Sequence, residues 1–126
     1  MPKDAYNVIM ADGSNLDGLW TAEFGGIPNF LGGGVIVVVD NRIFGGDSDY
    51  YYTGLMNVSD ARISAVVEVT SFVPVPSSIW GTPEKKFTVR LSGVHVSPNH
   101  MSCKLNRTEF PNVTIPVELT KRADLA

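Results

Sequence analysis

Short β-rich runs separated by tight turns dominate the sequence from Gly18 onward. Valine, isoleucine, tyrosine, phenylalanine and threonine fill the runs, whereas glycine, asparagine, aspartate, serine and proline fill the gaps, as is typical of strands joined by turns. No segment has the apolar spacing of an amphipathic helix. The sequence therefore predicts eight strands, over residues 18–24, 33–39, 42–46, 50–56, 61–72, 86–96, 100–106 and 113–119.

Apolar and polar residues alternate along several of these runs. In the run 61–72, Ile63 and Val67 fall on one side, whereas Arg62 and Glu68 fall on the other. Because successive side chains of a strand point to opposite faces, one side of each such strand is expected in the core. The same reasoning predicts an inward-facing set that consists of Trp20, Phe24, Ile63, Val67, Phe87, Val89, Leu91 and Met101.

Most connections between the runs are short, such as residues 40–41 and 97–99. Links of this length join antiparallel neighbours, because a parallel crossover needs about a dozen residues. Eight meandering strands can close on themselves and so remove exposed sheet edges. An open sandwich is the alternative, but sandwiches usually need longer Greek-key connections. The expected fold class is therefore all-β, an eight-stranded antiparallel up-and-down barrel.

The chain has the length of one domain, with the barrel at 18–120, a flexible leader at 1–17 and a C-terminal tail at 121–126. Residues 73–85 form a longer loop whose three prolines oppose regular strand pairing. Its apolar members Val75, Ile79 and Trp80 are expected to leave water. This plug-like loop is therefore predicted to fold over one end of the barrel.

Charge and cysteine content argue against several classes of function. The ten basic residues are scattered through a chain of net charge −3, whereas a nucleic-acid binder clusters its cations. Cys103 is the only cysteine, so no intrachain disulfide is possible. No apolar run reaches the length of a signal peptide or a membrane span. We expect a cytoplasmic protein without direct contact to nucleic acid or membrane.

No pattern of catalytic or metal-ligating residues stands out. The segment 45–49 combines glycines with Asp47 and Asp49, but a calcium loop is longer and a phosphate loop leads into a helix. His95 and His100 flank one turn, yet two histidines alone make a weak metal site. Nucleophile motifs such as Gly-x-Ser-x-Gly are absent from the sequence. The sequence thus predicts a non-enzymatic protein with no metal and no cofactor.

The barrel interior is the first candidate site. Eight strands enclose a space just wide enough for packed side chains or for one small ligand. Small residues fall at inward positions, and the space they leave favours an apolar cavity lined by the inward-facing set given above; they are Ala22, Gly54, Ala65, Gly93 and Cys103. The alternative is a solid core that Trp20 fills.

The strand at 35–39 has no polar face, because all five of its residues are β-branched and apolar. Either Ile36 and Val38 or the alternating set at 35, 37 and 39 must point outward. An outward apolar strand favours a covering partner, and twofold dimers are the commonest soluble oligomers. We predict a homodimer contact at Ile36 and Val38, or at Val37 in the opposite phase.

Three segments together resemble the GrlR-type regulators, small barrels named for a repressor of a type III secretion gene cluster. The segments are Gly-Leu-Trp at 18–20, the glycine-rich approach into 34–39, and Gly-Gly-Asp-Ser followed by Tyr-x-Gly within 45–54. The resemblance covers about Gly18 to Thr120. It implies a calycin-like barrel with an apolar interior, a plug-like loop and a tendency to dimerise.

The resemblance also implies a protein partner. The founding member of the family grips an activator protein through an acidic cluster that follows the Tyr-x-Gly strand. In this sequence that position carries a single carboxylate, Asp60, after Asn57. We place the expected partner surface at Tyr51, Asn57 and Asp60, because an outward tyrosine suits a contact surface.

Two functions follow from these expectations. The leading one is a regulatory or interaction module that binds a protein partner and, in the barrel, an apolar ligand. The alternative is a carrier of a small hydrophobic, lipid-like ligand.

Overall fold

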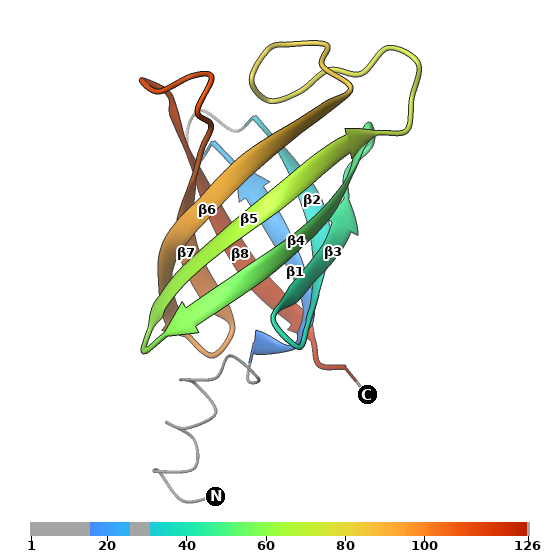
Figure 1. The fold of residues 1–126 in the computed structure, drawn as a ribbon. Coiled ribbons are helices and arrows are strands. Elements are labelled where there is room, and N and C mark those ends of the chain that lie inside the picture. The colour runs from blue at the N-terminus through green and yellow to red at the C-terminus, as the bar shows by residue number, and fades with distance from the viewer. Residues whose placement is uncertain (1–15, 26–30, 126) are drawn as a thin grey trace, which may run out of the picture.

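The computed structural model describes residues 16–25 and 31–125. They form a closed, up-and-down barrel in which eight antiparallel strands follow one another in sequence order (Figure 1). β8 pairs with β1, and this pairing closes the barrel. The strands are β1 (Gly18–Phe24), β2 (Gly32–Val39), β3 (Arg42–Gly46), β4 (Tyr50–Ser59), β5 (Arg62–Ser71), β6 (Lys86–Ser97), β7 (His100–Asn106) and β8 (Thr114–Ala123).

All eight predicted strands are present, and the predicted fold class is confirmed. The largest differences lie at strand ends. β4 continues through Ser59, so Asn57 belongs to a strand and not to a turn. β8 continues to Ala123, so the first part of the predicted tail is paired with β1. Among the described residues, no helix is long and apolar enough to cross a lipid bilayer.

The two ends of the barrel differ in how they are built. The end that carries the short β2–β3, β4–β5 and β6–β7 turns is called the lower end, as in Figure 1. There Asp40 and Asn41 have φ of 48° and 61°, as expected for a type I′ hairpin turn. The opposite, upper end carries the connections 72–85 and 107–113, which are longer (Figure 1).

Trp20 fills the lower part of the interior. Its side chain is fully buried, and its indole Nε1 donates a hydrogen bond of 2.8 Å to the carbonyl oxygen of Leu16. Leu16 is itself fully buried and packs in the same core cluster. The predicted leader therefore ends in a docked segment, whereas its residues 1–15 lie outside the described part of the chain.

Alternate residues of β2 point inward at Ile36 and Val38, both of which are buried. The prediction that these two residues form a dimer contact is therefore wrong. Ile36 lies opposite Trp20 of β1, whose indole must face the core, and this pairing sets the phase of β2. The outward residues are Val35, Val37 and Val39, which agrees with the opposite phase considered from the sequence.

Glycines at inward positions let neighbouring strands approach each other closely. A Cβ atom at Gly93 would lie 2.6 Å from Cα of Cys103, and one at Gly54 would lie 2.7 Å from the carbonyl oxygen of Val66. Real Cβ atoms do not approach backbone so closely, so both positions require glycine. The adjoining strand occupies the space that these glycines were expected to leave for a ligand.

Candidate ligand cavity

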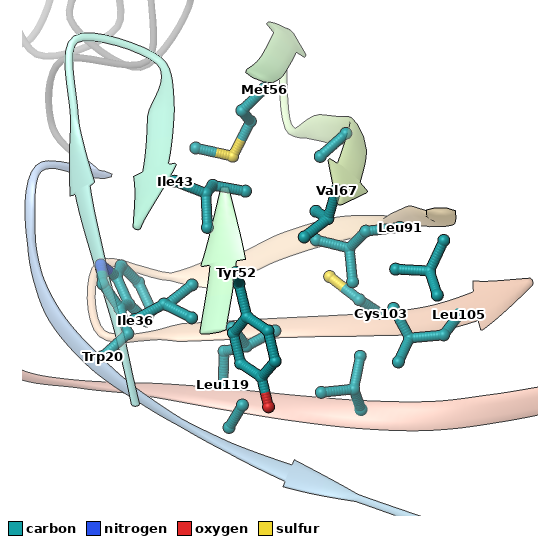
Figure 2. Packing of buried hydrophobic residues seen from close by; sticks show 14 of the residues in the cluster. Trp20, Ile36, Ile43, Tyr52, Met56, Val67, Leu91, Cys103, Leu105 and Leu119 are labelled. Atoms are coloured by element: carbon teal, nitrogen blue, oxygen red, sulfur yellow. The ribbon is translucent and has the colours of Figure 1, made fainter. Parts of the chain in front are cut away.

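A cavity of about 230 Å³ lies in the upper half of the barrel, beneath the loop 72–85. Side chains from β1, β2, β3, β4, β5, β6, β7 and β8 contribute to its wall, together with residues 77–80 of the loop. Most of the lining is apolar, as is usual for small-molecule sites. Figure 2 shows Tyr52, Leu91, Leu105 and Leu119, from four different strands, with their side chains in this interior.

Five of the eight residues predicted to line a cavity do so, namely Phe24, Val67, Phe87, Val89 and Leu91. The other three are buried but lie nearer the lower end, where they form a solid core; they are Trp20, Ile63 and Met101. Both structures considered for the interior therefore occur, with an apolar cavity in the upper half and a solid core in the lower half. Of the small residues expected to leave space, Ala22 lines the cavity.

Several lining residues were not predicted from the sequence. The sequence predicts a dimer contact for Ile36, and it suggests Asp47 only as part of a calcium or phosphate loop, which its length and context oppose. Tyr50 and Tyr52 are buried, whereas Tyr51 between them points outward. The outward direction of Tyr51 agrees with its expected place on a contact surface.

A hydrogen-bonded carboxylate and phenol form the polar part of the wall. The hydroxyl of Tyr52 donates to Oδ2 of Asp47. The other carboxylate oxygen of Asp47 accepts the backbone N–H groups of Asp49 and Tyr50, each at 2.9 Å. Burial, the hydrogen bond to Asp47 and the charge of Asp47 all raise the pKa of Tyr52, so its phenol stays protonated.

The loop 72–85 is tied to the barrel on both sides. The backbone N–H of Ser77 donates to Oδ2 of Asp49 at 2.9 Å, and the hydroxyl of Tyr50 donates to the carbonyl oxygen of Glu84 at 2.6 Å. Ile79 and Trp80 pack partly buried against the core and line the cavity, as expected for a plug. Val75 does not follow the prediction, because it is 83% exposed.

Arg107 joins this loop to the connection between β7 and β8. Its side chain is fully buried, and its guanidinium donates to both carboxylate oxygens of Glu84 at 2.9 and 2.8 Å and to Glu109 at 3.2 Å. Its Cζ lies 4.3 Å from the ring centroid of Phe87 and 4.9 Å from that of Phe110, distances typical of cation–π contacts. We call this arrangement the Arg107 latch; nothing in the sequence distinguishes Arg107 from a surface arginine.

Other reactive side chains are dispersed. His95 points inward, and burial lowers its pKa, whereas His100 faces outward and lies 2.7 Å from the Glu118 carboxylate. The two histidines therefore lie on opposite faces of the sheet. Burial raises the pKa of the Cys103 thiol to about 12, which keeps it protonated. No group of three or more metal-ligating side chains occurs within the described residues.

The predicted partner surface is divided in the structure. Tyr51 is exposed near the upper end of β4, whereas Asp60 lies in the β4–β5 turn at the lower end. Asn57 is six residues from Tyr51 along the strand, a separation of about 20 Å. These three residues therefore do not form one compact surface.

A different group of exposed side chains does cluster. Phe44 lies opposite Thr53 and beside Val37, and Leu55 lies opposite Val66. Together they make an apolar outer face on β2 to β5, which consists of Val35, Val37, Phe44, Tyr51, Leu55 and Val66. We refer to this set as the β2–β5 outer face.

No family model and no curated protein matches the chain. The resemblance to the GrlR-type regulators thus rests on the sequence motifs described above and stays a prediction.

Proposed function

We propose that this protein is a non-catalytic binding module whose barrel holds one small, mostly apolar ligand. The observation that carries the proposal is the cavity of about 230 Å³, which is lined mostly by apolar strand residues and by a loop that is tied to the barrel. Such a site needs no cofactor. We place the protein in the cytoplasm, for which the single, buried, protonated cysteine is the supporting observation.

Native mass spectrometry of freshly purified protein tests the proposal directly. We expect a fraction of the chains to carry one bound small molecule, released on denaturation. A fluorescent apolar probe should also bind with a stoichiometry of one per chain and should compete with that molecule.

A pair of substitutions on neighbouring residues locates the probe. Val67 lines the cavity, whereas Val66 points outward on the same strand. Val67→Trp should fill the cavity and weaken probe binding at least tenfold, whereas Val66→Trp should leave it unchanged. Because overpacking costs about 1 to 3 kcal/mol, circular dichroism must show that both variants are folded. Equal probe affinity in the two folded variants would contradict the proposal.

The second candidate function is a GrlR-like regulatory module that sequesters a protein partner. The β2–β5 outer face favours an interaction role, because Leu55 is 68% exposed and lies between Val66 of β5 and Arg42 of β3. The occupant that we propose for this face is a second copy of the chain. If the protein is monomeric, the face is free for a different protein instead. Stoichiometric retention of one transcription factor in a pull-down would then favour the regulator.

A further inference from the structure

The cavity wall carries a negatively charged side chain and no positively charged one. Among the described residues that line the cavity, Asp47 is the only one with a charged side chain, and lysine, arginine and histidine are missing from the set. The remaining polar groups on lining side chains are uncharged; they are the indole N–H of Trp80 and the hydroxyls of Tyr50, Tyr52 and three serines. The cavity therefore presents a negative group to a ligand and no positive one.

The carboxylate of Asp47 is held by donors that suit its ionised form. Two backbone N–H groups and the hydroxyl of Tyr52 all point toward it. In the described part of the chain no cation lies within ion-pair distance of Asp47. The nearby guanidinium of Arg107 is already bound by Glu84 and Glu109. An anion without a counter-ion beside an apolar cavity favours a cationic ligand group and repels an anionic one.

Aromatic rings add a second source of attraction for a cation. Phe24 of β1 and Tyr50 and Tyr52 of β4 line the cavity together with Asp47. The negative face of an aromatic ring attracts an ammonium group, and the attraction is larger where water is excluded. The aromatic rings and the Asp47 carboxylate therefore both favour a ligand with a cationic group.

The volume limits the size of the ligand. Drug-sized molecules occupy pockets of about 300 to 1,000 Å³, so a cavity of about 230 Å³ takes something smaller. At about 30 Å³ per water-sized group, it accommodates on the order of eight non-hydrogen atoms. A single ring with a short side chain fits this limit, whereas a long acyl chain exceeds it.

We infer that the cavity is selective for a small organic amine, with its ammonium group at the Asp47 carboxylate and its apolar body among the barrel side chains. Fatty acids and other carboxylates are excluded by the same charge. The inference rests on the proposed function, since it names the class of ligand for the same cavity.

Three probes of nearly equal size and different charge test the inference. They are benzylamine, benzyl alcohol and benzoate, measured by isothermal titration calorimetry at pH 7. We expect the amine to bind at least tenfold more tightly than the alcohol, and the carboxylate to bind more weakly than the alcohol.

Substitution of the carboxylate should remove this order. Asp47→Asn keeps an oxygen that can accept the two backbone N–H groups but lacks the charge. In this variant we expect the amine and the alcohol to bind equally, with the affinity for the alcohol retained. Asp60→Asn, at the lower end of the barrel, is the matched control and should preserve the order of the wild type.

The outcomes separate the inference from the proposed function. If the alcohol binds and the amine binds no more tightly, the amine inference is wrong and the ligand-binding proposal stands. If none of the three probes binds and the apolar probe also fails to bind, both are wrong. Should Asp47→Asn not fold, Tyr52→Phe replaces it, because this variant frees Oδ2 of Asp47 and should strengthen the preference for the amine; a lost preference would contradict the inference.

Discussion

Trp20 combines the largest fully buried side chain of the barrel with a hydrogen bond to the segment that precedes β1. Replacement by alanine removes the packing of the indole and leaves a void beside β2. We predict that Trp20→Ala lowers the free energy of unfolding by about 3 to 5 kcal/mol, as for other buried aromatic residues. Chemical denaturation followed by circular dichroism measures this loss. A loss below about 1 kcal/mol would mean that the indole is not buried in the barrel.

The position of Trp20 below the cavity supplies an internal control. Trp20 does not line the cavity, so a folded Trp20→Phe variant should bind an apolar probe as tightly as the wild type. It should still be less stable by about 1 to 3 kcal/mol, because the carbonyl oxygen of Leu16 loses its buried donor.

Individual residues differ in how well their place can be predicted from the sequence. Ile63 and Val67 alternate with polar neighbours, so their inward direction follows from the chain itself. Ile36 and Val38 lie in a run without polar residues, and only pairing with Trp20 of β1 sets their direction. Arg107 was beyond prediction because its burial depends on Glu84, a residue 23 positions away.

At the scale of elements, the Arg107 latch holds two connections together over the upper end of the barrel. Glu84 belongs to the loop 72–85, and Arg107 begins the connection 107–113. The hydrogen bonds from Arg107 are the main reason why the pKa of the Glu84 carboxyl lies below its ordinary value. The folded protein therefore binds a proton at Glu84 less readily than the unfolded chain does.

This difference predicts how the stability changes with pH. A lowered pKa in the folded state contributes stability that is complete above the ordinary pKa of 4.5 and is lost as the pH falls through the folded value. We predict that Glu84→Gln is less stable at pH 7 by about 1 kcal/mol, a figure reduced because the Glu84 side chain is 36% exposed. The variant should also lose less stability on acidification than the wild type.

Glu68 offers a matched control for the latch. It faces Lys86 at 3.9 Å, and both side chains are more than half exposed, so Glu68→Gln should change the stability by well under 1 kcal/mol. Denaturation midpoints measured from pH 7 to pH 3 compare the two variants. Identical pH profiles for both variants and the wild type would show that protonation of Glu84 does not contribute to the pH dependence of the stability.

At the scale of the whole molecule, the order of the strands was predictable because, among the links that the structure describes, every connection but the loop 72–85 is too short for a crossover. The division of the interior into a cavity and a solid core was not predictable. Residues from all eight strands meet at the cavity, and the volume left over depends on how Tyr50, Tyr52 and the plug residues fill the upper end. No local pattern in the sequence encodes the volume of the cavity, because that volume depends on residues that are far apart in the chain.

The β2–β5 outer face leads to the last prediction, which concerns the oligomeric state. Phe44, Tyr51 and Leu55 are 44%, 47% and 68% exposed, so each forgoes roughly half of the about 1.5 to 3 kcal/mol that full burial of a large apolar side chain contributes. A second copy of the same face, related by a twofold axis, would cover them, and a twofold contact places each residue near its own copy. Lysines there would repel across the axis, so Val37→Lys combined with Leu55→Lys should give a folded monomer, whereas Val96→Lys, near the end of β6, outside this face and 57% exposed, should remain dimeric. Light scattering at high micromolar concentration measures the mass of all three proteins, and a wild type that is already monomeric would contradict the dimer.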